Sequence, residues 1–387
     1  MGEQDGHYES MYGMQMMHTS TDRREQFGNF LDEFEDVQLQ LGSKLTSLMS
    51  DMTGSHYWAR SGLFTVIGAE VAQGLPSSQV SYSFLRGAAK QYATLLIGNP
   101  STCGRFGDKC YNGSSSATGG FTHDARKCNG SSQIMQPNFC GPQCGPSLSL
   151  LRRLLYQHIS YNSAVLLLES FGGVNPNGVD ATMDGVVTTN LSQLRLTPIA
   201  KLQVGVRTAM RDIEVGVHQA PIAFLLDFMS GWMPPRRLYD GQPAPDVHDT
   251  KLFQPYWQGK LYRTAFGALV PYEPGDYLTN NLFKLAYPFW EDSSYFWNED
   301  GFLSATPYGD GVDTLLSDAP GWLLRRYGTI VVAGGIQSQT GVSAELGHKL
   351  QAFMEEPVGG HVVITAGSLK QLQVATATIF ADIDVSR

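Results

Sequence analysis

The segment FTVIGAEVAQG, residues 64–74, decides how the first half of the chain folds. Its first residues are apolar or β-branched, and an apolar run of this length is typical of a strand that is buried on both faces. Glu70 comes at the point where such a strand ends. Active sites of α/β barrels collect at the carboxyl ends of their strands. Glu70 is therefore a candidate functional residue.

Apolar strands and helices alternate around this segment. The residues predict a helix at 78–92, a strand at 93–100, a helix at 146–163, a strand at 164–171 and a helix at 191–213. In residues 20–52 the apolar positions recur every three to four residues, which predicts an amphipathic helix or a broken pair of helices. Such alternation implies a parallel sheet covered by helices, as an α/β barrel or a doubly wound sheet.

A second unit begins near Ala220, so we expect one domain at 1–219 and another at 220–387. Its apolar strands end in Gly or Asp before a loop and are followed by helices, a pattern that predicts a Rossmann-like or flavodoxin-like layer. The loop VVAGGIQSQTG, residues 331–341, matches neither the dinucleotide fingerprint nor the phosphate-binding loop. We therefore expect no cofactor.

Composition excludes several classes of function. The chain has 387 residues and a formal net charge of −9, with no cluster of Lys and Arg longer than a pair. This charge pattern lacks the basic surface that nucleic-acid binding needs. No apolar run approaches the roughly 18 residues of a membrane-spanning helix.

All five cysteines lie within residues 103–144, a segment rich in Gly, Ser and Asn. We interpret this insertion as a loop held by disulfides, because its spacing completes no zinc site. Glycosylation sequons begin at Asn112, Asn129 and Asn190. Together these features predict a secreted or extracellular glycoprotein. The first residues, MGEQDGHYES, form no signal peptide, which suggests that the native protein starts further upstream.

Two acids, Glu70 and Glu169, end apolar strands. Two carboxylates that converge at such ends can hydrolyse a glycosidic bond, because one is kept protonated while the other stays ionised. The alternative is structural: each Glu caps the next helix or pairs with an arginine such as Arg86 or Arg152. Further acids, Glu3 and Asp5, stand near the start of the chain.

An ordered series of motifs carries a resemblance to a known family. The series is GEQDG, IGAE, LPSSQ, FLRGAAKQY, SLSLLRRLLY and PIAFLLDF. It resembles uncharacterised glycoside-hydrolase-like proteins, which are similar in plan to the β-galactosidases of glycoside hydrolase family 42. The resemblance implies a (β/α)8 barrel followed by a Rossmann-like domain of the class I glutamine amidotransferase type. No cysteine follows Cys144, which excludes a Cys-His amidotransferase.

The resemblance also implies a retaining glycosidase that acts on a carbohydrate substrate, with a glutamate pair as acid and nucleophile. The implied catalytic residues are Glu169, Glu70 and Glu3. Glu169 stands on barrel strand seven by one count and on strand eight by another. The implied substrate-binding residues are Asp5, Gln79, Arg86 and Asn99. Arg86 orients a site carboxylate or is a structural partner of Glu70.

About three convincing barrel strands precede the second unit, whereas a complete barrel has eight. We therefore expect the C-terminal part of a barrel, incomplete at its N-terminus, in a fragment of a longer glycosidase. The second domain is expected to form homo-oligomers. The alternative function is that of a catalytically inactive carbohydrate-binding, cell-surface or assembly protein derived from such an enzyme.

Overall fold

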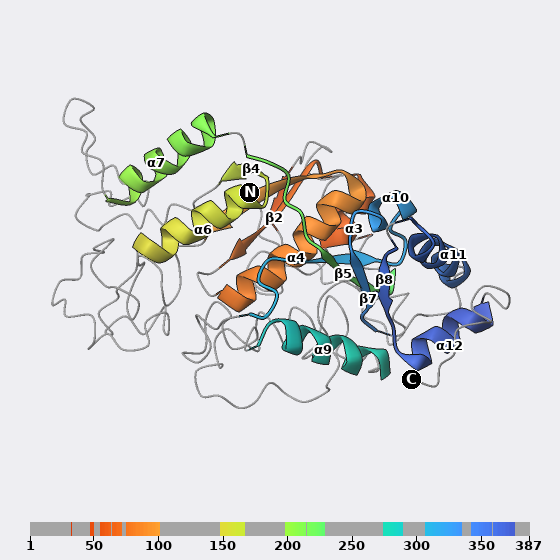
Figure 1. The fold of residues 1–387 in the computed structure, drawn as a ribbon. Helices are drawn as coiled ribbons and strands as arrows, with labels where there is room; N and C mark the ends of the chain where they lie inside the picture. The colour runs from red at the N-terminus through yellow and green to blue at the C-terminus, as the bar shows by residue number, and fades with distance from the viewer. Residues whose placement is uncertain are drawn as a thin grey trace, which may run out of the picture.

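The protein is an α/β structure with two parallel sheets (Figure 1). The computed structural model describes residues 32, 47–49, 55–62, 64–71, 75–100, 148–166, 198–213, 215–228, 274–288, 306–334, 342–357 and 359–375. The cysteines and sequons lie outside these ranges, as do Glu3, Asp5 and Glu169. The predictions of disulfides and of glycosylation therefore stay predictions.

The first sheet has four parallel strands whose spatial order follows the chain, β1-β2-β3-β4. The strands are β1 (Ser47–Met49), β2 (Val66–Val71), β3 (Leu95–Pro100) and β4 (Ser163–Leu166). Helix α3 (Ser55–Ser61) precedes β2, α4 (Leu75–Tyr92) joins β2 to β3, and α6 (Leu148–Ser160) precedes β4. The predicted alternation is confirmed. Ser47–Met49, predicted as helix, form a strand instead, because pairing with β2 outweighs the local helical pattern.

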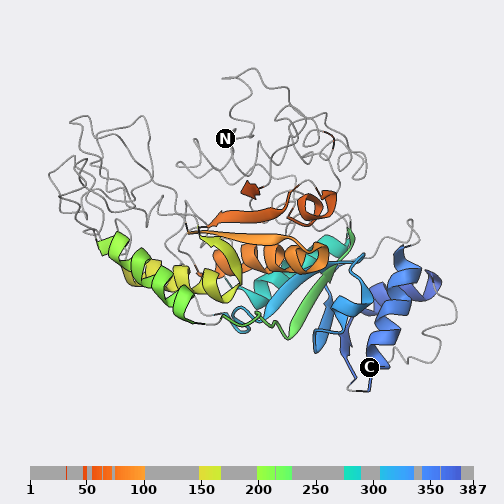
Figure 2. The ribbon, with the colours of Figure 1, turned by 90° about the horizontal axis from the view of Figure 1, so that it is seen from above.

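Helices α4 and α6 cover the same face of this sheet (Figure 2). Ile67, Ala69 and Leu96 lie in one apolar cluster with the buried side chains of α4. Gly98 faces α6, since a Cβ on this glycine would lie 2.6 Å from a ring carbon of His158. Successive residues of a strand point to opposite faces. Gly68, Ile97 and Asn99 therefore belong to the face turned away from α4 and α6.

The second sheet also has four parallel strands, in the order β6-β5-β7-β8. They are β5 (Ile222–Leu226), β6 (Val312–Leu316), β7 (Thr329–Val332) and β8 (His361–Val363). Its helices are α9 (Pro274–Ala286), α10 (Gly321–Leu324), α11 (Val342–Met354) and α12 (Ala366–Ala375). The side chains of α9 pack on one face, and those of α10, α11 and α12 on the other. This doubly covered sheet, with its reversal of order beside β5, confirms the Rossmann-like layer.

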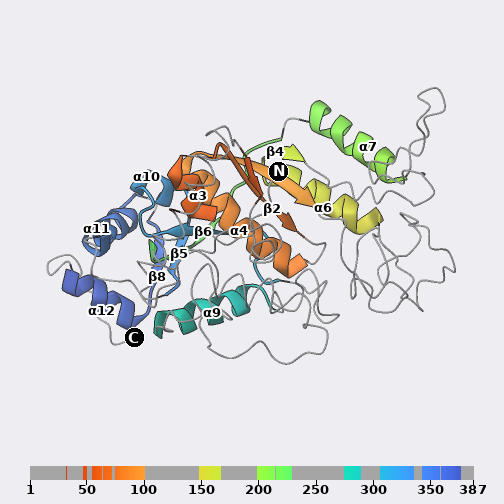
Figure 3. The same ribbon diagram turned by 180° about the vertical axis from the view of Figure 1, so that it is seen from behind.

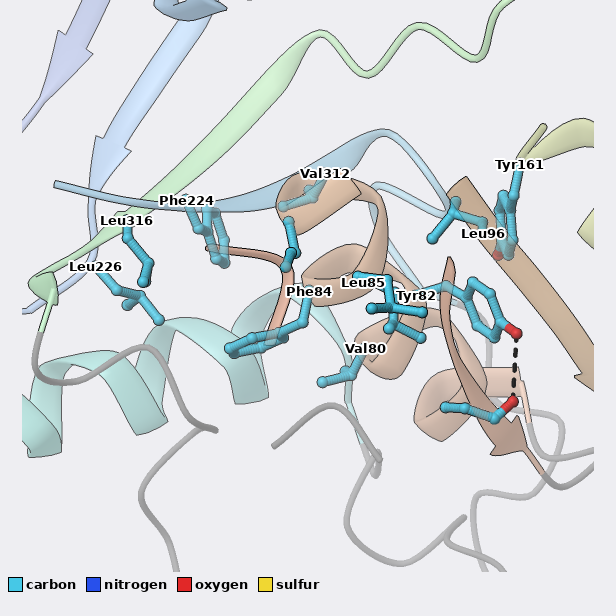
Figure 4. Close-up of a cluster of buried hydrophobic side chains, with 14 of the residues drawn as sticks. Val80, Tyr82, Phe84, Leu85, Leu96, Tyr161, Phe224, Leu226, Val312 and Leu316 are labelled. Atoms are coloured by element: carbon cyan, nitrogen blue, oxygen red, sulfur yellow. Dashed lines mark hydrogen bonds between the residues drawn. The ribbon is translucent and has the colours of Figure 1, made fainter. Parts of the chain in front are cut away.

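A single apolar core joins the two sheets. Phe84 and Leu85 of α4 are buried in one cluster with Ile67 of the first sheet and with Phe224 and Val312 of the second (Figure 4). Helix α4 thus lies between the sheets (Figure 2). The predicted boundary between residues 219 and 220 falls between the two sheets, but the core runs across it.

Helix α4 also covers the free edge of β6, the outer strand of the second sheet. Arg86 Nη2 donates a hydrogen bond to Val312 O at 2.7 Å, and Leu316 N donates to Gln91 Oε1 at 3.0 Å. Between them Thr314 O is bound by His56 Nε2 of α3 at 2.9 Å. These backbone groups point away from β5, because alternate residues of a strand face alternate neighbours. Side chains of α3 and α4 therefore satisfy an edge that another strand would otherwise pair with.

Helix α7 (Pro198–Asp212) lies at the opposite end of the molecule from α11 and α12 (Figure 3). It packs on α6, through a small cluster in which Val206 meets Leu155 and Ile159. Among the described helices, none combines the length and the apolar character that crossing a membrane requires.

Gly87 permits the close approach of α4 to β6, since a Cβ at this position would lie 1.7 Å from Thr314 O. Gly87→Ala is therefore expected to lower the free energy of unfolding by at least about 2 to 3 kcal/mol, or to prevent folding. Urea denaturation measures this. The matched control is Gly205→Ala on α7, where an added Cβ meets nothing within 4 Å. This control should raise stability by roughly 0.5 to 1 kcal/mol. Equal effects of the two changes would show that the contact with β6 is not the reason for the glycine.

Candidate functional site

The carboxyl ends of β2 and β3 bring two of the predicted site residues together. Glu70 is the register partner of Asn99, and Val71 that of Pro100. Because the strands are parallel, their carboxyl ends meet at one edge of the sheet. The backbone of Glu70 therefore lies beside that of Asn99, at the edge where the sequence predicts a site.

Asn99 contributes a polar side chain to this edge, and the structure describes that side chain. It is 4% exposed, and its Oδ1 has no hydrogen-bond partner within the described part of the chain. A buried acceptor without a partner costs about 1 to 3 kcal/mol, so its retention calls for an explanation. A hydroxyl or amide donor of a bound molecule would satisfy this oxygen.

The neighbouring strand β4 ends shortly before Glu169, the third candidate residue at a strand end. Leu166, the last residue of β4, pairs in register with Gly98, and Glu169 follows three residues later in the sequence. Glu169 itself lies outside the described residues, as do Glu3 and Asp5. Their roles as catalytic or substrate-binding residues stay predictions.

Gln79 lies near the start of α4, the helix that leaves the carboxyl end of β2. It is 7% exposed, and its Oε1 accepts a hydrogen bond from Thr306 Oγ1 at 3.1 Å. Its carbonyl oxygen is thus already engaged by the protein. A direct contact with substrate would have to use the amide nitrogen.

Arg86 holds the two sheets together. Its Nε donates to Asp313 Oδ1 at 2.8 Å, and its Nη2 donates to Val312 O and to Asp310 O. The guanidinium carbon lies 4.4 Å from the centre of the Tyr161 ring. All these hydrogen bonds go to the strand β6 and the residues before it. They favour the structural alternative for Arg86, with Asp313 as the partner.

Asp313 was not predicted from the sequence, although two signals point to it. An acid interrupts the apolar strand VDTLL, and α4 carries Arg86 and Lys90 one turn apart in RGAAK. Lys90 Nζ and Tyr327 OH both donate to Asp313 Oδ2. Burial favours the neutral acid, but Arg86 and Lys90 outweigh it and hold the pKa of Asp313 below its usual value. Asp313 is therefore ionised in the interior.

Three histidines are held neutral in the interior. Burial and, to a smaller extent, the nearby Arg153 lower the pKa of His158 to about 3. Burial likewise lowers the pKa of His56 to about 4, against the opposing effect of its bond to Thr314 O. His218, which is half-buried, also has a pKa of about 4 for this reason. The rings contribute packing here: His158 lies 4.6 Å from the Tyr82 ring, centre to centre.

No group of three or more metal-binding side chains is found in the described part of the chain. Comparison with protein-family models gives no match for this sequence, and comparison with curated proteins gives none either. Function is therefore inferred from the residues of the carboxyl edge.

Arg86→Met leaves the buried carboxylate of Asp313 without its fully buried cation, since the side chain of Lys90 is partly exposed. We expect the free energy of unfolding to fall by about 3 to 5 kcal/mol, the usual result when one partner of a buried ion pair is removed. Urea denaturation at neutral pH checks this. The control is Arg152→Met, which removes an exposed arginine from α6 and should change stability by no more than about 0.5 kcal/mol. A similar small effect at both positions would contradict the structural role of Arg86.

Stability should fall as the pH is lowered from about 6.5 to about 4. In this window the unfolded chain takes up protons on His56 and His158, whereas the folded protein does not. Each of these histidines contributes about 1.4 kcal/mol per pH unit to the slope. The raised pKa of Asp318 acts in the opposite direction in the lower part of the window.

Two variants separate the contribution of His158 to this pH dependence from the contributions of the other titrating groups. His158→Phe removes the titrating ring, so the plot of unfolding free energy against pH should become shallower by about one proton. Gly205→Ala, which alters no titratable group, should leave the slope unchanged. If His158→Phe leaves the slope unchanged as well, His158 is charged in the folded protein.

Proposed function

We propose that this chain is a retaining glycoside hydrolase, or part of one, with its site at the carboxyl edge of the first sheet. The observation that carries the proposal is the register pair of Glu70 and the buried, unsatisfied Asn99. Carboxylate and amide side chains bind sugar hydroxyls, and the strand register places the backbones of these two residues side by side. The resemblance of the motif series to glycoside-hydrolase-like proteins supports the same function.

The arrangement of the first sheet supports the proposal that this sheet is part of a barrel. Its strands follow the chain in order, and α4 and α6 lie on one face. Every segment of a (β/α)8 barrel has this arrangement, with the helices outside and the strands inside. A doubly wound sheet instead has helices on both faces and a reversal of strand order, as the second sheet does. In a barrel, the face of Asn99 would be the interior, where substrates bind.

The proposed chemistry is a double displacement by two carboxylates. Glu169 attacks the anomeric carbon, while Glu70 or Glu3 protonates the leaving-group oxygen as the glycosidic bond breaks. Water then attacks the glycosyl-enzyme bond, and the same acid residue, now a base, takes the proton from that water. Such a pair must lie about 5 to 5.5 Å apart. Asp5, Gln79 and Asn99 would hold the sugar hydroxyls, and no cofactor takes part.

Hydrolysis of a panel of aryl glycosides by the purified chain tests this function. Glu169→Gln is expected to lower kcat by at least 100-fold, because the side chain keeps its shape and loses its charge. Glu70→Gln is expected to lower kcat/KM. The matched control, Glu345→Gln, changes an exposed glutamate on α11 and should leave turnover unaffected.

Two results would overturn the proposal. Unchanged turnover in Glu169→Gln would remove the nucleophile from the mechanism. Glycan binding without turnover by the unmodified chain would instead assign it to the inactive carbohydrate-binding derivatives of such enzymes.

A further inference from the structure

The segment between α7 and β5 carries an open backbone edge. It runs from Val215 to Pro221 without helical turns (Figure 1). Val217 is 67% exposed and Val215 is 37% exposed. The residues between α7 and this edge include a third exposed apolar side chain, that of Ile213. Exposed apolar residues are informative when they occur together, because contiguous apolar surface marks interaction sites.

Asn162 holds one side of this segment as a strand would. Its Nδ2 donates to Gly216 O at 2.6 Å, and its Oδ1 accepts from His218 N at 2.5 Å. A residue of a neighbouring parallel strand makes the same pair of bonds, to the carbonyl of one residue and the N–H two residues later. Residues 216–218 are therefore bound on the side of Asn162 as a neighbouring parallel strand would bind them, although no described strand lies there.

Asn162 is itself fixed by its place at the end of α6. Its backbone φ is +62°, and its N–H donates to Ile159 O at 3.0 Å. Asparagine tolerates this left-handed conformation better than most residues. The backbone that carries the Asn162 side chain is thus held in place at the helix terminus.

The other side of the segment makes no backbone hydrogen bond to the described residues. Since Gly216 and His218 turn their backbone groups toward Asn162, Val215 and Val217 turn theirs the opposite way. Neither valine makes a backbone hydrogen bond to any described residue. No charged residue or proline stands within 215–217, and these are the residues with which proteins protect free edges. This edge is therefore suited to accept another strand.

We propose that the same segment of a second copy of this chain pairs here, antiparallel, about a two-fold axis at Gly216. The sequence Val215-Gly216-Val217 reads the same in both directions. In this register each Val215 faces Val217 of the second copy, and both carry outward backbone groups that can exchange hydrogen bonds. Each Gly216 faces its own counterpart as a non-hydrogen-bonded pair, where the Cα atoms approach to about 4.5 Å.

This symmetry favours a second copy over an unrelated peptide. A two-fold interface requires a patch that is complementary to itself, and the three residues meet that condition in hydrogen bonding and in side-chain type. The interface differs from one made by the second sheet, which the resemblance implies. It also does not depend on catalysis, so its test is separate from that of the proposed function.

The first experiment is a site-directed disulfide at the axis. Gly216→Cys suits this purpose, because an added Cβ meets nothing within 4 Å and the backbone φ is not positive. The expected Cα separation lies within the range for disulfides. Under mild oxidation the variant should form a covalent dimer, with the peptide containing residue 216 linked to itself in mass spectrometry. Gly205→Cys, equally open on α7, is the matched control and should not form the link. Equal yields from the two variants would refute the register.

The second experiment needs no oxidation. Sedimentation equilibrium of the unmodified chain should show a concentration-dependent dimer. Val217→Lys should raise the dissociation constant at least about tenfold, which corresponds to about 1.4 kcal/mol. Val204→Lys, at a valine of α7 that is 51% exposed, should leave it unchanged. A chain that is monomeric at every concentration, or equal dissociation constants for the two lysine variants, would overturn the proposal.

Discussion

The outer edge of β6 is the constraint on which the rest of the structure depends. A strand at the edge of a sheet exposes a row of unpaired backbone groups. Here α4 lies along that edge, and its side chains and those of α3 bind the groups that face away from β5. Because α4 follows β2 directly in the chain, fixing α4 on β6 also fixes β2, and with it the pair of Glu70 and Asn99. The second sheet thus positions the site of the first.

The ion pair between Arg86 and Asp313 gives this contact its specificity. Apolar side chains could slide along one another, whereas a buried carboxylate must meet its cation and its hydrogen-bond donors in one register. Asp313 accepts hydrogen bonds from Arg86 and Lys90 of α4 and from Tyr327, which lies between α10 and β7. Desolvation offsets much of the attraction within such a pair, so its net contribution to stability is small. Its role is to select one arrangement of the two sheets.

Local patterns in the sequence predict most elements but not their long-range partners. The strands β2 and β3 and the helices α4 and α6 carry their own apolar periodicity, and they were predicted to within a few residues. Helix α9 lies in the aromatic, Pro-rich region after β5 and was not predicted, because Pro and aromatic residues obscure its pattern. The pairing of Arg86 with Asp313 spans 227 positions of sequence. No local pattern encodes such a pair, so the sequence suggested the nearby Glu70 as the partner.

The two sheets differ in how their carboxyl edges are satisfied, and this difference locates the site. At the second sheet, Ala333 O accepts from Thr279 Oγ1 of α9, and Gly334 O accepts from Ser368 Oγ of α12. Helices α9 and α12 of the second sheet therefore bind these two backbone carbonyls. At the first sheet, Asn99 Oδ1 is buried without a described partner. Arg86 Nη1 is also buried without a described partner, but the same guanidinium is already bound to Asp313 and to Val312 O. Asn99 instead stands at the end of a strand where its register partner is an acid, and a bound hydroxyl would complete its hydrogen bonding there.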